Sequence, residues 1–217
     1  MKKLEHGRSM IEMLGVLAIV GVLSVGAIAG YSKAMMKYKL NKQAQQLNTI
    51  INAVAKHAHS FDNLQEAQSI LPYLVKMGEI PKEMIVPNYP EIIRDVFNME
   101  INTRISPYST TVENAVKGVV SLIFHPRLTL KSNENLEICK NIFTVIKENS
   151  SSIYYGYSGS GYNTDDFRQS VFYGDNYCSQ GDNCIKDLTV EKIYSECSLH
   201  VGNNVTETGT IYILWKL

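Results

Sequence analysis

Four cysteines carry the most reactive side chains of this 217-residue chain, and all of them lie in its last 79 residues. They are Cys139, Cys178, Cys184 and Cys197. An even, clustered set is typical of disulfides formed in an oxidising compartment. The alternative is a zinc site, which needs closely paired cysteine or histidine ligands. Five residues separate Cys178 from Cys184, and no histidine neighbours Cys139. We therefore expect disulfides and no metal, with three pairings open.

The other reactive side chains form no catalytic pattern. The glycine-rich segment 156–161 fits neither the G-x-S-x-G nor the G-x-G-x-x-G motif. Four aspartates could offer oxygen ligands to calcium, but the D-x-[DN]-x-[DN]-G pattern is missing, which favours ordinary turn chemistry. These are Asp165, Asp166, Asp175 and Asp182. The histidines are scattered, at positions 6, 57, 59, 125 and 200. We expect no enzyme, no catalytic residue and no cofactor.

Tyrosine is concentrated in one part of the chain. Six tyrosines fall within the 24 residues from Tyr154 to Tyr177, together with Ser, Gly and Asn. Such a mixture can form an adaptable recognition surface. Tyrosines that simply edge a small sheet and its loops would look the same, and we favour this interpretation.

An acidic residue, Glu12, stands at the head of a long apolar run. From Met13 to Gly30 no residue is charged and only Ser24 is polar, which just reaches the length needed to cross a bilayer. A signal peptide cleaved at the small residues 27–29 is one interpretation, and a plain membrane anchor is a second. Neither interpretation gives Glu12 a role, so a third is needed.

The segment Gly7-Arg8-Ser9-Met10-Ile11-Glu12-Met13-Leu14 resembles the processing site of type IV prepilins. In that family a dedicated peptidase cuts after a glycine that ends a short basic leader, and the new N-terminal amine is methylated. The fifth mature residue is a glutamate that opens a hydrophobic helix. The resemblance implies cleavage between Gly7 and Arg8, with Glu12 at the fifth position and Arg8 where the family usually has phenylalanine. It implies that Glu12 and the amine of Arg8 act together in assembly.

The residues after the apolar run predict that the helix continues. Apolar residues recur there at spacings of three and four, at Leu40, Ala44, Leu47, Ile51, Val54 and Ala58. Polar residues such as Gln46 and Asn48 are expected on other faces. No proline precedes Pro72, so one helix can run from Ser9 to about His59. Half of it is expected to meet lipid and half to pack on a head.

Charge divides the chain in the same way. The whole chain is neutral, with 21 basic and 21 acidic residues, which argues against a general nucleic-acid binder. Residues 60–217 carry 13 basic and 19 acidic residues, whereas residues 8–59 hold Glu12 as their one acid. A basic, apolar arm therefore precedes an acidic head, and the cysteines place that head on the oxidising side.

The head is expected to contain both helices and strands. The helices are predicted over 63–77, capped by Asp62 and stopped by Gly78, over 133–148, capped by Ser132, and over 190–196, capped by Thr189. Strands are predicted over 117–124, with 127–131 as an extension, over 153–157 and over 210–215. Residues 159–182 are expected to form a loop. The fold class is α+β: a long N-terminal helix, half membrane-spanning and half head-packing, with a small antiparallel-sheet globular head.

This head resembles, more weakly, the type IVb pilins. The points of resemblance are the segment Tyr73–Pro81, a helix carrying Cys139, and Cys197 before a last strand. The C-terminal disulfide loop of pilins implies the pairing Cys139–Cys197 with Cys178–Cys184. The pairing Cys139–Cys178 with Cys184–Cys197 stays open.

The expected function is that of a structural subunit of a type IVb-like pilus, polymerised through its N-terminal helix. Residues 1–7 would be the leader, 8–59 the helix with its apolar part at about 10–30, and 60–217 the head. The partners implied are other copies of the chain, the prepilin peptidase, the assembly platform and inner-membrane lipid. The location implied is a single pass through the inner membrane with a periplasmic head, then an extracellular pilus. The alternatives are a minor pilin or secretion pseudopilin, and a membrane-tethered adhesin or binding module that does not polymerise.

Overall fold

A computed structural model describes residues 10–61, 66–109, 116–125, 133–159, 170–181, 183–201 and 210–217 of the chain. The chain divides into two compact units, residues 1–39 and 40–217. The second unit, called the head from here on, is a mixed α+β structure around a six-stranded antiparallel sheet. The fold class expected from the sequence is confirmed.

The long helix α1 runs without a break from Met10 to His57, and a 3₁₀ turn follows at Ala58–Phe61. Its 48 residues contain no proline, so every backbone N–H beyond the first turn can bond within the helix. The predicted continuity is thus confirmed for the described residues; Arg8 and Ser9 lie outside them. The early part of α1 belongs to the first unit and the part from Leu40 onward to the head.

Within the head, α1 buries the face that the apolar spacing predicted. Leu47, Ile51, Val54 and Ala58 are buried, while Leu40 and Ala44 are half-buried. The prediction for Gln46 is wrong, because this side chain is buried together with Gln43. Their buried positions show that one flank of the packing face is polar.

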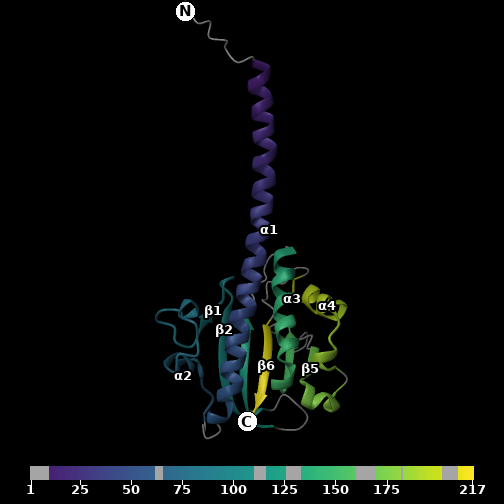
Figure 1. The fold of residues 1–217 in the computed structure, drawn as a ribbon. Helices are drawn as coiled ribbons and strands as arrows, with labels where there is room; N and C mark the ends of the chain where they lie inside the picture. The colour runs from purple at the N-terminus through teal and green to yellow at the C-terminus, as the bar shows by residue number, and fades with distance from the viewer. Residues whose placement is uncertain are drawn as a thin grey trace, which may run out of the picture. The chain divides into compact units, whose positions relative to one another are not determined.

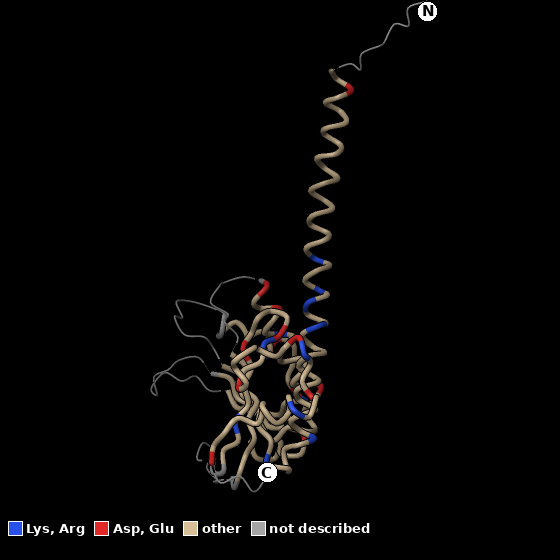
Figure 2. The backbone as a smooth tube through the Cα atoms, turned by 90° about the vertical axis from the view of Figure 1, so that its left-hand side faces the viewer, with Lys and Arg blue, Asp and Glu red and all other residues tan. Residues whose placement is uncertain are grey.

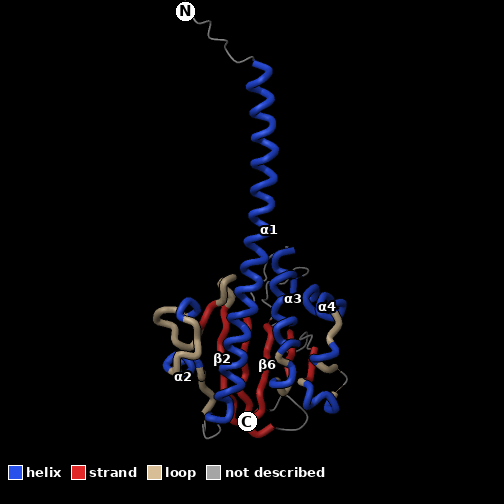
Figure 3. Tube along the Cα trace, viewed as in Figure 1, coloured by secondary structure: helices blue, strands red, loops and turns tan. Residues whose placement is uncertain are grey.

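The sheet has the strand order β1-β2-β3-β6-β4-β5, and all neighbours are antiparallel. The strands are β1 Ile93–Arg94, β2 Glu100–Ser109, β3 Val116–His125, β4 Tyr155–Gly159, β5 Ser170–Tyr173 and β6 Thr210–Lys216. The last strand of the chain therefore lies in the middle of the sheet, paired with β3 on one side and β4 on the other. Figure 3 shows β6 at this central position.

Three of the strands had been predicted and three had not. The predictions over 117–124 and 210–215 correspond to β3 and β6, and the prediction over 153–157 corresponds to β4. The expectation of a loop over 159–182 is wrong at Ser170–Tyr173, where β5 pairs with β4, and at Asp175–Gln180, which is a 3₁₀ helix. The possible strand at 127–131 lies outside the described residues.

Two of the three predicted head helices are present close to their expected bounds. Helix α3 runs over Asn133–Glu148, and α4 runs over Val190–Val201, five residues further than predicted. Thr189 caps α4, because its Oγ1 accepts a hydrogen bond from the Lys192 N–H at 3.1 Å. Ser132 lies outside the described residues.

The helix predicted over 63–77 is wrong at its start. Helix α2 runs only over Leu71–Lys76, Ile70 occupies its N-cap position, and Asp62 lies outside the described residues. Pro72 sits in the first turn of α2, where its missing N–H costs nothing. Gly78 ends the turn after the helix with a φ of 75°, as its type predicted.

Helices cover one face of the sheet. In Figures 1 and 3, α3 and the head part of α1 lie side by side in front of the strands. The strand residues beneath them are apolar and buried: Ile101, Ile105, Leu122, Phe124, Ile213 and Trp215. Alternate residues along the same strands face the opposite side, where the aromatic cluster and the polar hollow described below are found.

Candidate functional site

The most unusual surface of the first unit is the apolar part of α1. The large apolar side chains from Met10 to Ile28 are all more than half exposed. Figure 2 shows this stretch free of charged residues between an acidic position at its start and basic positions at its end. By length and composition α1 can cross a membrane. The 18 uncharged residues span about 27 Å of helix, close to the roughly 30 Å of a bilayer's hydrocarbon core.

The one hydroxyl within the apolar stretch is satisfied by the helix itself. Ser24 Oγ donates to the carbonyl of Val20 at 2.7 Å. In hydrocarbon an unpaired hydroxyl would be costly, so this bond makes Ser24 compatible with lipid. No polar group between Met13 and Gly30 therefore opposes burial in a membrane.

Glu12 lies in the first turn of α1, where the positive end of the helix dipole stabilises a carboxylate. That effect reaches only the first turn. Gly7 and Arg8, the residues of the expected processing site, lie outside the described residues.

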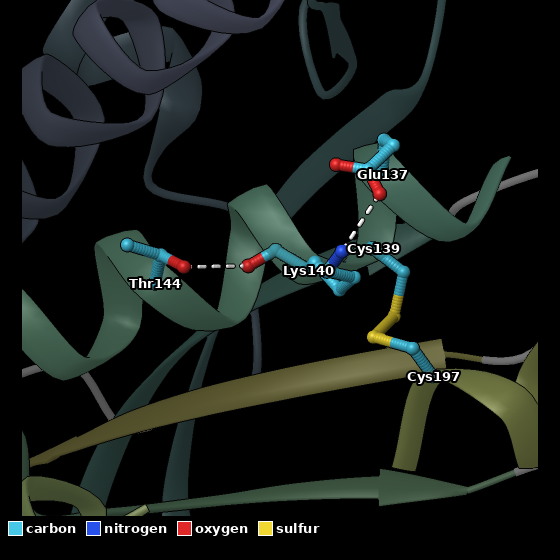
Figure 4. Close-up of a disulfide and its surroundings, with 5 residues drawn as sticks. All are labelled: Glu137, Cys139, Lys140, Thr144 and Cys197. Atoms are coloured by element: carbon cyan, nitrogen blue, oxygen red, sulfur yellow. Dashed lines mark hydrogen bonds and ion pairs between the residues drawn. A yellow bond between two sulfur atoms is a disulfide. The ribbon is translucent and has the colours of Figure 1, made fainter. Parts of the chain in front are cut away.

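The Cys139–Cys197 disulfide joins α3 to α4. Both residues are fully buried, and their Cα atoms are 5.7 Å apart. Figure 4 shows Cys139 directed from α3 toward Cys197, while Lys140 turns to Glu137 on the exposed side of α3, 2.7 Å away. The bond therefore ties two helices through cysteines that are 58 residues apart in sequence.

The second disulfide, Cys178–Cys184, closes a loop next to β5. The Asp175 carboxylate lies within 4.8 Å of both sulfurs. Among the described residues, these three form the one cluster of side chains of metal-binding type. Sulfurs bonded to each other are not thiolates and do not act as metal ligands. Asp165, Asp166 and Asp182 lie outside the described residues, so the structure does not bear on calcium at these positions.

The tyrosines form a packed cluster on the sheet face opposite the helices. Tyr154 and Tyr155 are buried with Val119 and Leu214. Tyr157 stacks on Tyr212 across β4 and β6, with ring centroids 4.3 Å apart. Other members meet edge-on, as Tyr154 and Tyr177 do at 4.6 Å. Burial, followed by the neighbouring phenols of Tyr212 and Tyr155, raises the pKa of Tyr157. These tyrosines therefore pack on the sheet and its adjoining loops, which agrees with the interpretation favoured from the sequence; Tyr162 lies outside the described residues.

A buried polar network joins α1 to the rest of the head, and the sequence analysis missed it. Gln43 Nε2 donates to Asp95 Oδ2 at 2.6 Å, and Asn141 Nδ2 of α3 donates to Gln43 Oε1 at 2.8 Å. The Val96 N–H donates to Gln46 Oε1 at 2.9 Å. Burial raises the pKa of Asp95, although Gln43 and the Met99 and Phe97 N–H groups bond to its carboxylate. The available signal was a pair of glutamines three residues apart beside an apolar stripe.

A surface hollow of about 700 Å³ lies beside β2. It is lined by Asn102 and Arg104 of β2 and by residues 67–69 and 88–92. The Asn102 Oδ1 is buried without a hydrogen-bond partner in the described part of the chain, while its Nδ2 lies 3.2 Å from His125 Nε2. Burial lowers the pKa of His125. The lining offers amides, one exposed tyrosine, one guanidinium and the Glu91 carboxylate, which can bind a polar ligand.

Comparison of the chain with family models, with curated proteins and with solved structures finds no match in any of the three. The functional argument therefore depends on the residues and geometry of this chain.

Proposed function

We propose that this protein is a pilin-like structural subunit, stored in a membrane through the apolar part of α1 and assembled into a type IVb-like filament through the same helix. The observation that carries this proposal is that three features occur in one helix. Glu12 lies in its first turn, 18 uncharged and exposed residues follow, and the second half of α1 packs into a disulfide-bonded head. A cleaved signal peptide has no use for a helix that runs unbroken into the head.

The role of Glu12 follows from the cost of a carboxylate in lipid. An ionised carboxylate costs about 2.5–3.5 kcal/mol at the bilayer centre on insertion scales, and the cost is lower at the end of the apolar stretch, where Glu12 stands. In a bundle of these helices, the amine created by cleavage before Arg8 would neutralise Glu12 of a neighbouring copy. This pairing would select for assembly in register, because only one stagger of two helices brings the amine to the carboxylate.

Glu12→Gln tests the proposal, since it keeps the shape of the side chain and removes its charge. We expect the variant to insert into membrane at the normal level and to form few or no filaments, as seen by electron microscopy of sheared cell-surface material. Ser24→Ala, which changes a polar residue of the same helix without touching charge, is the matched control and should assemble normally. Normal filaments from Glu12→Gln would show that the carboxylate only stabilises its own helix end.

A membrane-tethered binding module is the second candidate, and the hollow beside β2 favours it. The unpartnered Asn102 Oδ1 and the exposed Tyr89 give this hollow groups that a polar ligand can use. A tether gains nothing from Glu12, so the same substitution separates the two candidates. A minor pilin or a secretion pseudopilin would share the chemistry of Glu12 and differ in abundance, which the mass-spectrometric identity of the main filament band measures.

A further inference from the structure

Two lysines that follow the apolar part of α1 lack any acidic partner on their own helix. Lys33 and Lys37 are exposed and stand one turn apart. Between Glu12 and Asp62 the chain has no acidic residue, so no i±3 or i±4 neighbour can neutralise either lysine. Like charges at this spacing destabilise a helix. An anion that neutralises the pair must therefore come from outside the helix.

Lys42, further along α1, shows the contrasting case. Its Nζ lies 2.8 Å from the Glu83 carboxylate of the head, so its charge is compensated within the fold. Lys33 and Lys37 have no ion pair within the described residues. The difference is one of position, because these two precede Leu40, where the head begins.

We propose that Lys33 and Lys37 bind the phosphate groups of anionic phospholipids in the leaflet on the head side of the membrane. This inference rests on the membrane-anchored part of the proposed function and not on filament assembly. The Cβ atoms of two lysines one helical turn apart lie about 5–6 Å from each other, so both ammonium groups can reach one phosphate.

The depth of the two lysines fits the polar layer of a bilayer. With Gly30 at the edge of the hydrocarbon, Lys33 lies about 4.5 Å and Lys37 about 10.5 Å further along the helix. The headgroup layer on each side is about 5–7 Å thick. Helical side chains lean toward the N-terminus, here toward the membrane, and a lysine can extend along apolar surface to place its ammonium in the polar layer. Lys37 therefore also reaches the phosphates.

Two tyrosines flank the two lysines on this part of the helix. Tyr31 and Tyr38 are 66% and 62% exposed, and two helical turns separate them on one face. Tyrosine is enriched where membrane meets water, because its ring is apolar and its hydroxyl is polar. The basic pair and the tyrosines together have the composition of an interfacial belt.

The test uses the full chain reconstituted in nanodiscs that contain equal amounts of phosphatidylglycerol and phosphatidylcholine. Native mass spectrometry then gives the ratio of the two lipids retained by the protein. We expect wild type to retain phosphatidylglycerol preferentially, with about a fivefold contribution from each lysine. Lys33→Gln/Lys37→Gln should lose this preference, whereas Lys33→Arg/Lys37→Arg should keep it.

Lys76→Gln/Lys82→Gln is the matched control, because it removes two exposed lysines from the head. It should retain the lipid preference of wild type. Equal retention of phosphatidylglycerol by the Lys33/Lys37 glutamine variant and wild type would overturn the proposal. An equal loss of the preference in the Lys76/Lys82 variant would also overturn it, because the effect would then follow total charge and not these two positions. Because no filament is needed in the nanodisc, a failure of the proposed function leaves this result readable by itself.

Discussion

Replacing both Cys139 and Cys197 with alanine should destabilise the head more than the same replacement at Cys178 and Cys184. The reason is the length of chain that each bond closes. The first bond spans 58 residues and the second spans 6. On the chain-entropy model these loops are worth roughly 4 and roughly 2 kcal/mol of unfolding free energy.

Trp215 provides the assay. It is the one tryptophan of the chain, and it is 4% exposed in the central strand β6. Its fluorescence should shift to longer wavelength when the sheet unfolds. Guanidinium titration of the full chain in detergent then measures the loss. With a slope of about 4 kcal/mol per molar, the midpoint should fall by about 1 M for the first pair and about 0.5 M for the second.

A reducing titration separates loop entropy from packing. Cys139 and Cys197 are fully buried, so their substitution also removes packed atoms. With reductant present, both disulfides of wild type are open, so wild type and variants have the same unclosed chain. The remaining difference between their guanidinium midpoints then measures the effect of packing alone. Equal midpoint shifts for the two pairs under oxidising conditions would refute the loop argument. A tryptic peptide linking Cys139 to Cys178 would refute the pairing itself.

Three further predictions concern processing, pH and packing. Intact mass of the membrane form should correspond to a chain that begins at a methylated Arg8, and a start at Gly30 would indicate an ordinary signal peptide. Because burial raises the pKa of Asp95, the folded head holds this proton more tightly than the unfolded chain, so stability should fall as pH rises from about 4 through the raised pKa. Asp95→Asn should remove that part of the pH dependence, and an unchanged profile by Trp215 fluorescence would contradict the assignment. Gly174→Ala should destabilise the head by about 3 kcal/mol, since a Cβ there would overlap the carbonyl of Ile153, whereas Gly21→Ala, with open space around it, should unfold like wild type.

Local sequence patterns predicted those elements whose side chains repeat with a regular period. The apolar spacing of α1 and the helix α3 were predicted close to their bounds, because both have apolar residues at the helical period. Strand β3 was predicted as a short, nearly continuous apolar run that ends before Pro126. Strand β2 was missed although its buried Ile101 and Ile105 alternate with the polar Asn102 and Arg104 at the period of a half-buried strand. The buried residue between the two isoleucines is Thr103, so the apolar signal in this stretch is weak. The start of α2 was misplaced because Asp62 is a typical capping residue, whereas the described residues from Glu66 to Ile70 are not helical.

Only the tertiary structure decided which distant residues meet. No pattern in the segment Thr210–Lys216 predicts that it pairs with β3 and β4 in the middle of the sheet. Likewise, the burial of Gln43 depends on Asp95 and Asn141, each brought to it from more than 50 residues away. A buried amide is stable only where such partners satisfy it, and the partners are supplied by the packing of separate elements. The sequence by itself determined the periodic elements, the apolar segment and the position of Glu12, because these properties are local; the strand order and the buried polar contacts belong to the folded chain.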